Sequence, residues 1–199
     1  MDFRTALYVL IALEAKPLDK FGHQPRLYAL TTQVGEGQHY DDDVVYAAAW
    51  LHDLGVFIGH RPEDPEALAR WDHVLYTVDR APFFLAQAGF PQEKVAAVLD
   101  AIRTHQPQDK PSTLEGVILR DADILEQLGA IGIMRTLAKV GRDGRFPTFT
   151  PAVAVLRRNL EKLPGELRLD RARVLAEPKI RLLEAFLSAA AREAVPDLF

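Results

Sequence analysis

The sequence predicts an all-α protein. Apolar residues recur at helical spacing, polar caps, prolines and glycines mark the ends of these stretches, and no segment alternates with the two-residue period of a strand. The 199 residues are 48% hydrophobic and 26% charged, which is typical of a globular protein with a sizeable core. This length suits one domain. We therefore expect a single compact multi-helix bundle over residues 1–199.

In the first half of the chain, each predicted helix has a start or a stop signal. Three aspartates at 41–43 supply carboxylates for a helix N-terminus, where unpaired N–H groups need acceptors. The apolar helix that follows ends at Gly55, which places His52 and Asp53 in its last turn. Asp64 caps a later helix. The predicted helices are 3–15, 23–34, 44–54 and 65–79, followed by a short apolar stretch at 82–89.

The second half of the chain carries longer helical patterns. Pro91 opens a helix with apolar residues at i, i+3, i+4 and i+7, and His105 lies at its end. Ser112 and Glu115 fit a capping box, which predicts one long helix from about 113 to 140 that Gly141 ends. Two further helices are predicted at 150–163 and at 166–195, the second with a break at Glu177-Pro178.

Composition excludes several classes of protein. The chain has no cysteine, which rules out thiol nucleophiles, disulfides, thiolate zinc sites and iron–sulfur clusters. A formal charge of −4 and a pI near 5.9 argue against general affinity for nucleic acid. The apolar run at 7–13 is too short to span a bilayer and no cleavage site follows it. We expect a cytoplasmic protein with neither a membrane nor a nucleic-acid partner.

The His52-Asp53 dipeptide is the first candidate for chemistry. A carboxylate at a helix C-terminus faces the negative end of the helix dipole, so Asp53 needs a compensating cation. A divalent metal bound to the neutral imidazole and the carboxylate supplies one. The alternative is that both side chains cap the helix end and pair with an arginine.

Other polar residues extend this candidate site. His23 starts a predicted helix and shares a face with Arg26 one turn later. Asp121 and Asp123 lie in a helix that is apolar almost all round, where an unpaired carboxylate is costly to bury. These two carboxylates project about 200° apart, so they cannot reach the same site, and the helical pattern does not choose between them. Salt bridges to arginines are the alternative for Asp123.

The order of these residues resembles a known signature. His23, His52-Asp53 and Asp123 follow the H…HD…D order of the HD-domain superfamily of metal-dependent phosphohydrolases. His23 with Arg26 is similar to the family's H-x-x-R opening. The string AAAWLHDLG is close to the common A-A-L-L-H-D-I-G.

Two more strings resemble one bacterial branch of predicted HD hydrolases. RDADILEQLGAIGIMR is similar to the D-A-D-x-L-x-x-x-G-A-x-G-I-x-R string of that branch, and His105 matches its I-x-x-H. The resemblance covers about residues 20–145. The helices predicted over 150–195 lie outside it, and we expect them to pack on this HD-type core.

The resemblance implies roles for individual residues. It implies that Asp123 is a metal ligand and that Asp121 supports the ligand shell. Asp53 and His105 are the implied catalytic residues, His105 by contacting the phosphate or assisting proton transfer. The full implied metal set is His23, His52, Asp53 and Asp123. The basic residues assigned to the substrate phosphate are Arg26, Arg135, Lys139 and Arg142.

The function expected from this resemblance is metal-dependent hydrolysis of a nucleotide or other small phosphate ester through a metal-activated water. A mixed histidine and carboxylate shell suits Mn²⁺, Fe²⁺, Co²⁺ or Ni²⁺ better than Mg²⁺. The partner is then a small phosphate-bearing substrate, and a homodimer is left open. Two alternatives remain, a non-catalytic ligand-binding or regulatory domain and a metal-free interaction module. His60 and His73 are candidates for a second ion but are treated as surface or core-edge residues, and His39 as a loop residue.

Overall fold

The computed structural model describes residues 1–17 and 22–194, and this part of the chain contains ten α-helices, two short 3-10 helices and no β-strand. The all-α prediction is confirmed. The chain divides into two compact units, Met1–Arg120 and the remainder from Asp121 onward. The organisation of residues 1–199 as one domain stays a prediction. None of the described helices is both long enough and apolar enough to cross a membrane.

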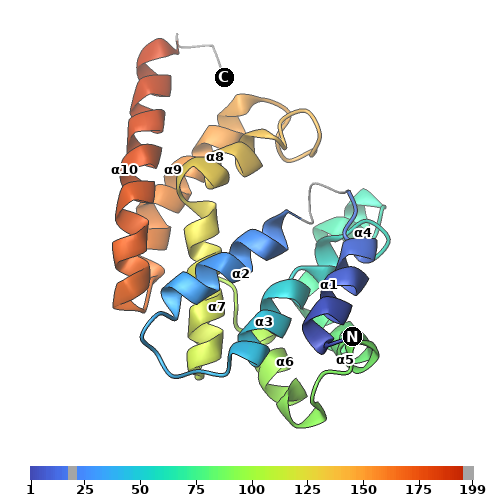
Figure 1. Cartoon of the computed structure of the whole chain (residues 1–199). Coiled ribbons are helices and arrows are strands. Elements are labelled where there is room, and N and C mark those ends of the chain that lie inside the picture. The colour runs from blue at the N-terminus through green and yellow to red at the C-terminus, as the bar shows by residue number, and fades with distance from the viewer. Residues whose placement is uncertain (18–21, 195–199) are drawn as a thin grey trace. The chain divides into compact units, whose positions relative to one another are not determined.

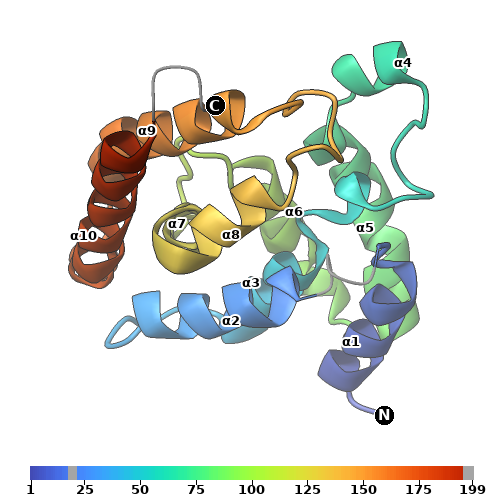
Figure 2. The same cartoon turned by 90° about the horizontal axis from the view of Figure 1, so that it is seen from above.

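The first unit is built around an apolar helix, α3 (Asp42–Leu51), which buries every residue from Val44 to Leu51. Asp41 caps this helix, since its carboxylate accepts the backbone N–H groups of Asp43 and Val44. A helix that is apolar on all sides needs neighbours on all sides. Four helices supply them (Figure 1, Figure 2): α1 (Phe3–Glu14), α2 (His23–Val34), α5 (His73–Ala88) and α6 (Val95–Arg103).

Two sequence predictions for the segment between α3 and α6 were wrong. The helix expected over 65–79 is in fact α4 (Pro65–Ala69) followed by a break, because the Asp72 carboxylate accepts the Leu75 N–H and starts α5. The separate stretch expected at 82–89 was also wrong, since α5 continues through Pro82. Its buried face packs along α1 and α6, and this burial outweighs the lost backbone hydrogen bond. The short helices of this unit are η2 (Leu54–Val56) and η3 (Gln92–Lys94).

The long helix predicted from 113 to 140 is two helices, α7 (Leu114–Gln127) and α8 (Gly129–Leu137). Gly129 has a φ of +69°, the left-handed region that favours glycine, so the helix cannot continue there. A Cβ at Gly132 would lie 2.1 Å from the Gln127 carbonyl oxygen, so this close approach also requires glycine. The cap of α7 lies one residue later than predicted, because the Thr113 hydroxyl accepts the Gly116 N–H at 3.2 Å.

Three helices of the second unit pack on one another: α8, α9 (Phe149–Glu166) and α10 (Asp170–Glu193). The break predicted at Glu177-Pro178 was wrong, since α10 runs through Pro178 without interruption. Buried Leu183 and Leu187 follow the proline, so the packed face of the helix extends past it.

Candidate metal centre

His52 and Asp53 lie immediately after the last residue of α3, not in its last turn as predicted. His52 is the C-cap residue of α3 and is 1% exposed. Its Nδ1 lies 3.0 Å from the Ala49 carbonyl oxygen. A carbonyl can only accept, so Nδ1 carries the proton and, in the neutral ring, Nε2 carries a lone pair. This tautomer is the one that a metal ligand needs at Nε2.

Three donor atoms converge beside this ring. His23, the first residue of α2, places its Nε2 3.1 Å from Nε2 of His52. Oδ2 of Asp53 lies 3.7 Å from the first nitrogen and 3.6 Å from the second. The point equidistant from the three atoms is about 2.0 Å from each, the usual distance of nitrogen and oxygen ligands from a first-row divalent ion. The three atoms therefore fit a divalent metal, and a cation or a shared proton must separate the two nitrogens.

Asp53 has two further imidazoles beside it. The ligand atoms of Asp53, His73 and His105 all lie within 4.8 Å of one another. His105 is 3% exposed and follows α6, and its Nδ1 lies 2.6 Å from the Ile102 carbonyl oxygen, which again leaves Nε2 as the basic atom. Four histidines thus surround one carboxylate. Burial alone raises the pKa of the Asp53 carboxyl, but the favourable electrostatic interaction of its carboxylate with the surrounding imidazoles outweighs it and holds that pKa well below its usual range.

The turn after Asp53 explains how α5 brings His73 to the site. The Gly55 N–H donates to the Thr77 hydroxyl at 3.0 Å, and the Gly55 carbonyl accepts the indole N–H of Trp71 at 2.8 Å. A Cβ on Gly55 would lie 2.6 Å from the His73 carbonyl oxygen. The start of α5 therefore lies directly against the turn, and only glycine permits this approach. Treating His73 as a surface or core-edge residue missed its place beside Asp53, because no local motif marks this packing.

The remaining first-unit histidines lie elsewhere. His60 has its Nε2 2.9 Å from a Glu14 carboxylate oxygen and its Nδ1 3.0 Å from the Tyr76 hydroxyl, so both ring nitrogens are occupied. His39 lies in the loop before α3, as predicted.

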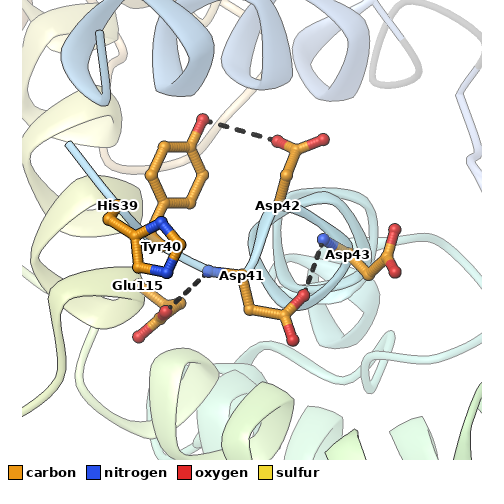
Figure 3. A pocket seen from close by; sticks show the side chains of 6 residues that line it. All are labelled: His39, Tyr40, Asp41, Asp42, Asp43 and Glu115. Atoms are coloured by element: carbon orange, nitrogen blue, oxygen red, sulfur yellow. Dashed lines mark hydrogen bonds between the residues drawn. The ribbon is translucent and has the colours of Figure 1, made fainter. Parts of the chain in front are cut away.

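His39 also lines a separate acidic pocket of about 490 Å³, whose other walls are Tyr40, Asp41, Asp42, Asp43 and Glu115 (Figure 3). Three of its four carboxylates already have cationic partners, and the fourth, Glu115, accepts the backbone N–H of Asp41 at 2.9 Å. Lys94 lies 2.8 Å from Asp41, and Arg4 lies 2.8 Å from Asp42 and 2.6 Å from Asp43. We therefore do not assign a metal to this pocket.

Asp121 and Asp123 both lie on the part of α7 that belongs to the second unit. Asp121 is fully buried, and its Oδ2 accepts the backbone N–H groups of Arg168 and Leu169 at 3.0 and 2.8 Å. Asp123 is half-buried and accepts from the Gln127 amide at 3.2 Å. Asp121 thus anchors the segment that leads into α10. The roles of Asp123 as a metal ligand and of Asp121 as its support stay predictions.

The four basic residues assigned to the substrate differ in their surroundings. Arg26 is half-buried on α2, one turn after His23. Arg135 forms an ion pair with the buried carboxylate of Glu126. The Lys139 ammonium lies 5.7 Å from the centre of the Phe146 ring, and Arg142 is exposed in the loop after α8. Their contacts with a phosphate stay predictions.

This fold and this histidine–aspartate cluster define the class of protein. The HD domain model matches residues 21–128, more than half of the chain, and the protein belongs to the HD domain family. The resemblance inferred from the sequence is therefore confirmed. The chain is 28% identical over 173 residues to the uncharacterized protein YpgQ of Bacillus subtilis (strain 168), a match that covers 83% of this chain and 79% of YpgQ.

Solved structures support the same fold. A crystal structure of Bacillus subtilis YpgQ matches with a TM-score of 0.73 and 23% identity, over 99% of this chain and 97% of that chain. YpgQ in complex with ADP matches with a TM-score of 0.70 and 22% identity, over 98% and 100%. A predicted HD-superfamily hydrolase from an uncultured Thermotogales bacterium matches with a TM-score of 0.66 and 24% identity, over 96% and 93%.

Proposed function

We propose that this protein is a metal-dependent phosphohydrolase that acts on a nucleotide or other small phosphate ester. The observation that carries the proposal is the convergence of the His23 and His52 Nε2 atoms with Oδ2 of Asp53, at separations that fit one divalent ion. Membership of the HD domain family supports it. The ADP complex of YpgQ supports a nucleotide as the substrate class.

A divalent ion bound at these residues would lower the pKa of a bound water and offset the negative charge of a phosphate. We assign Asp123 as its fourth ligand, with Asp121 in support. The mixed nitrogen and oxygen donors favour Mn²⁺, Fe²⁺, Co²⁺ or Ni²⁺ over Mg²⁺. The ionised state of Asp53 is the state in which a carboxylate binds a metal.

His105 is the residue best placed to move a proton. Its Nδ1–H is held by the Ile102 carbonyl, so a proton taken from water arrives at Nε2. The resulting imidazolium lies beside the Asp53 carboxylate, which stabilises the positive charge. Arg26 is assigned to the phosphate as a bidentate donor, together with Arg135, Lys139 and Arg142.

The test begins with protein purified without chelator. We expect bound divalent metal by elemental analysis, phosphate release from a panel of nucleotides and sugar phosphates with added Mn²⁺, and loss of this activity with chelator. His105→Ala should lower kcat by about 10²–10⁴-fold with little loss of metal. His39→Ala, which removes a loop imidazole away from the cluster, is the matched control and should leave kcat unchanged.

Two outcomes would contradict the proposal. A fully metallated preparation that hydrolyses none of these substrates would favour a non-catalytic ligand-binding or regulatory domain. A preparation that never retains divalent metal would favour a metal-free interaction module.

A further inference from the structure

A second cavity of about 580 Å³ adjoins the histidine cluster within the first unit. One wall is the segment 69–74, which runs from the end of α4 into α5, and the other contains Arg103, Gln106 and Asp109 from the end of α6 and the following loop. His73 belongs both to this lining and to the cluster around Asp53. The cavity therefore begins at the imidazoles, and its volume is in the usual range for a small-molecule site, roughly 300–1,000 Å³.

The aromatic wall of this cavity is Trp71. Its indole N–H is bonded to the Gly55 carbonyl at 2.8 Å, and its ring centre lies 5.1 Å from that of Tyr76. These contacts fix the plane of the ring, which remains partly exposed. A fixed, partly exposed indole suits a planar ring such as a nucleobase, because every base can stack on it.

The charges of the lining indicate which part of a nucleotide fits here. Arg70 and Arg103 form no ion pair with any residue of the described ranges. The carboxylates of Asp72 and Asp109 accept the backbone N–H groups of Leu75 and Gln106, at 2.9 and 3.0 Å. Two guanidinium groups and two carboxylates give no net formal charge. Such a wall suits a neutral group with several donors and acceptors better than a polyphosphate.

We propose that this cavity binds the nucleoside part of a nucleotide, with the base against Trp71 and its polar groups or the sugar hydroxyls bonded to Arg103 and Gln106. The phosphate then lies on the His73 side, next to the cluster. The inference rests on the proposed function, because a nucleotide substrate would occupy both this cavity and the adjoining histidine cluster. It assigns Trp71, Arg103 and Gln106 as specificity-determining residues.

The experiment measures binding of two probes, ADP and inorganic phosphate, to the metal-loaded full chain. A change in tryptophan fluorescence on binding is assigned to Trp71, because the other tryptophan, Trp50, is 3% exposed in the core and out of reach of a ligand in the cavity. In stopped-flow mixing, ADP should quench the tryptophan fluorescence, and inorganic phosphate should not. Trp71→Phe should abolish the quenching.

Arg103→Ala carries the affinity test, because Trp71→Phe also removes the bond to Gly55. It should weaken ADP binding by about 10-fold, the effect of one charged hydrogen-bond donor, and leave phosphate binding unchanged. Arg103→Lys should recover part of this loss. Arg80→Ala, which removes an exposed arginine elsewhere on α5, should change neither probe.

Unchanged ADP affinity in Arg103→Ala, or no quenching that depends on Trp71, would overturn the nucleoside site. A parallel loss of ADP and phosphate binding in Arg103→Ala would also overturn it, because the cavity would then bind the phosphate. These readouts need no turnover. Quenching by ADP without hydrolysis of any substrate would refute the proposed function and leave the nucleoside site standing. Hydrolysis of a substrate together with an unchanged ADP affinity in Arg103→Ala would support the proposed function and refute the nucleoside site.

Discussion

Gly55→Ala should destabilise the protein by distorting the turn that joins Asp53 to α5. The added Cβ would lie 2.6 Å from the His73 carbonyl oxygen and 2.9 Å from the His73 Cα. Both are backbone atoms, so no flexible side chain can move aside. Ordinary contact begins at 3.4 Å, so the start of α5 must retreat by about 0.8 Å.

The size of the effect follows from the contacts that this retreat breaks. The Gly55 hydrogen bonds to Thr77 and Trp71 are 3.0 and 2.8 Å long and would lengthen past useful range. Each is worth about 1 kcal/mol, and overpacking in a filled interior costs about 1–3 kcal/mol. We expect the free energy of unfolding to fall by about 3–5 kcal/mol. For a chain of this length the Tm should fall by roughly 6–20 °C.

Urea and thermal unfolding of wild type, Gly55→Ala and Gly144→Ala would test this. A Cβ at Gly144 meets no atom within 4 Å, so this variant controls for the change from glycine to alanine. The retreat of α5 should also move His73 away from Asp53. A Tm within about 1 °C of wild type would refute the reasoning, since it would mean that α5 does not rest on this turn.

Three further predictions concern the carboxylates. Asp53→Ala should weaken metal retention by more than about 100-fold, because loss of a residue that only supports a metal ligand already costs up to about 100-fold in metal affinity. It should leave the circular dichroism unchanged, because Asp53 follows α3 without forming part of it. Asp123→Ala should remove metal and activity, whereas Asp121→Ala should only reduce them. Asp121→Ala should also lower the free energy of unfolding by about 2–4 kcal/mol, because two partly buried backbone N–H groups lose their acceptor. The reverse ranking in metal and activity assays would show that the family motif is displaced by two residues. The hydrogen bond from Arg4 lowers the pKa of Asp43. This partly exposed pair contributes about 1 kcal/mol at most to the free energy of unfolding; the contribution is complete above the unfolded pKa near 4 and is lost as the pH falls through the lower folded pKa. Urea midpoints of wild type and Asp43→Asn should therefore differ at pH 7 and converge toward pH 3.

The positions of most helices could be predicted because their ends carry local signals. Asp41 and Asp64 cap the helices that follow them, as expected. Two prolines, in contrast, led to predicted helix breaks that the structure does not have. Pro82 and Pro178 lie inside continuous helices, because tertiary packing on both sides of each proline outweighs its local cost.

The candidate site shows a similar division. His23, His52 and Asp53 could be found from spacing, because helix starts and ends place them, and the structure brings these three together. The position of His73 could not be predicted in this way. It depends on the approach of two backbone segments at Gly55, and such a contact between distant segments leaves no periodic pattern in the sequence.

The rings of His52 and His105 are each anchored to a carbonyl three positions earlier, Ala49 and Ile102 respectively. Both carbonyls lie in the final turn of a helix, where no intrahelical N–H reaches them. The rotational entropy of the rings is therefore lost when the helices form, before a ligand arrives. Because these carbonyls belong to the last turns of α3 and α6, fraying of either turn releases the ring of His52 or of His105. Since helix ends open at lower free energy than the global fold, gentle heating should inactivate the protein before it unfolds.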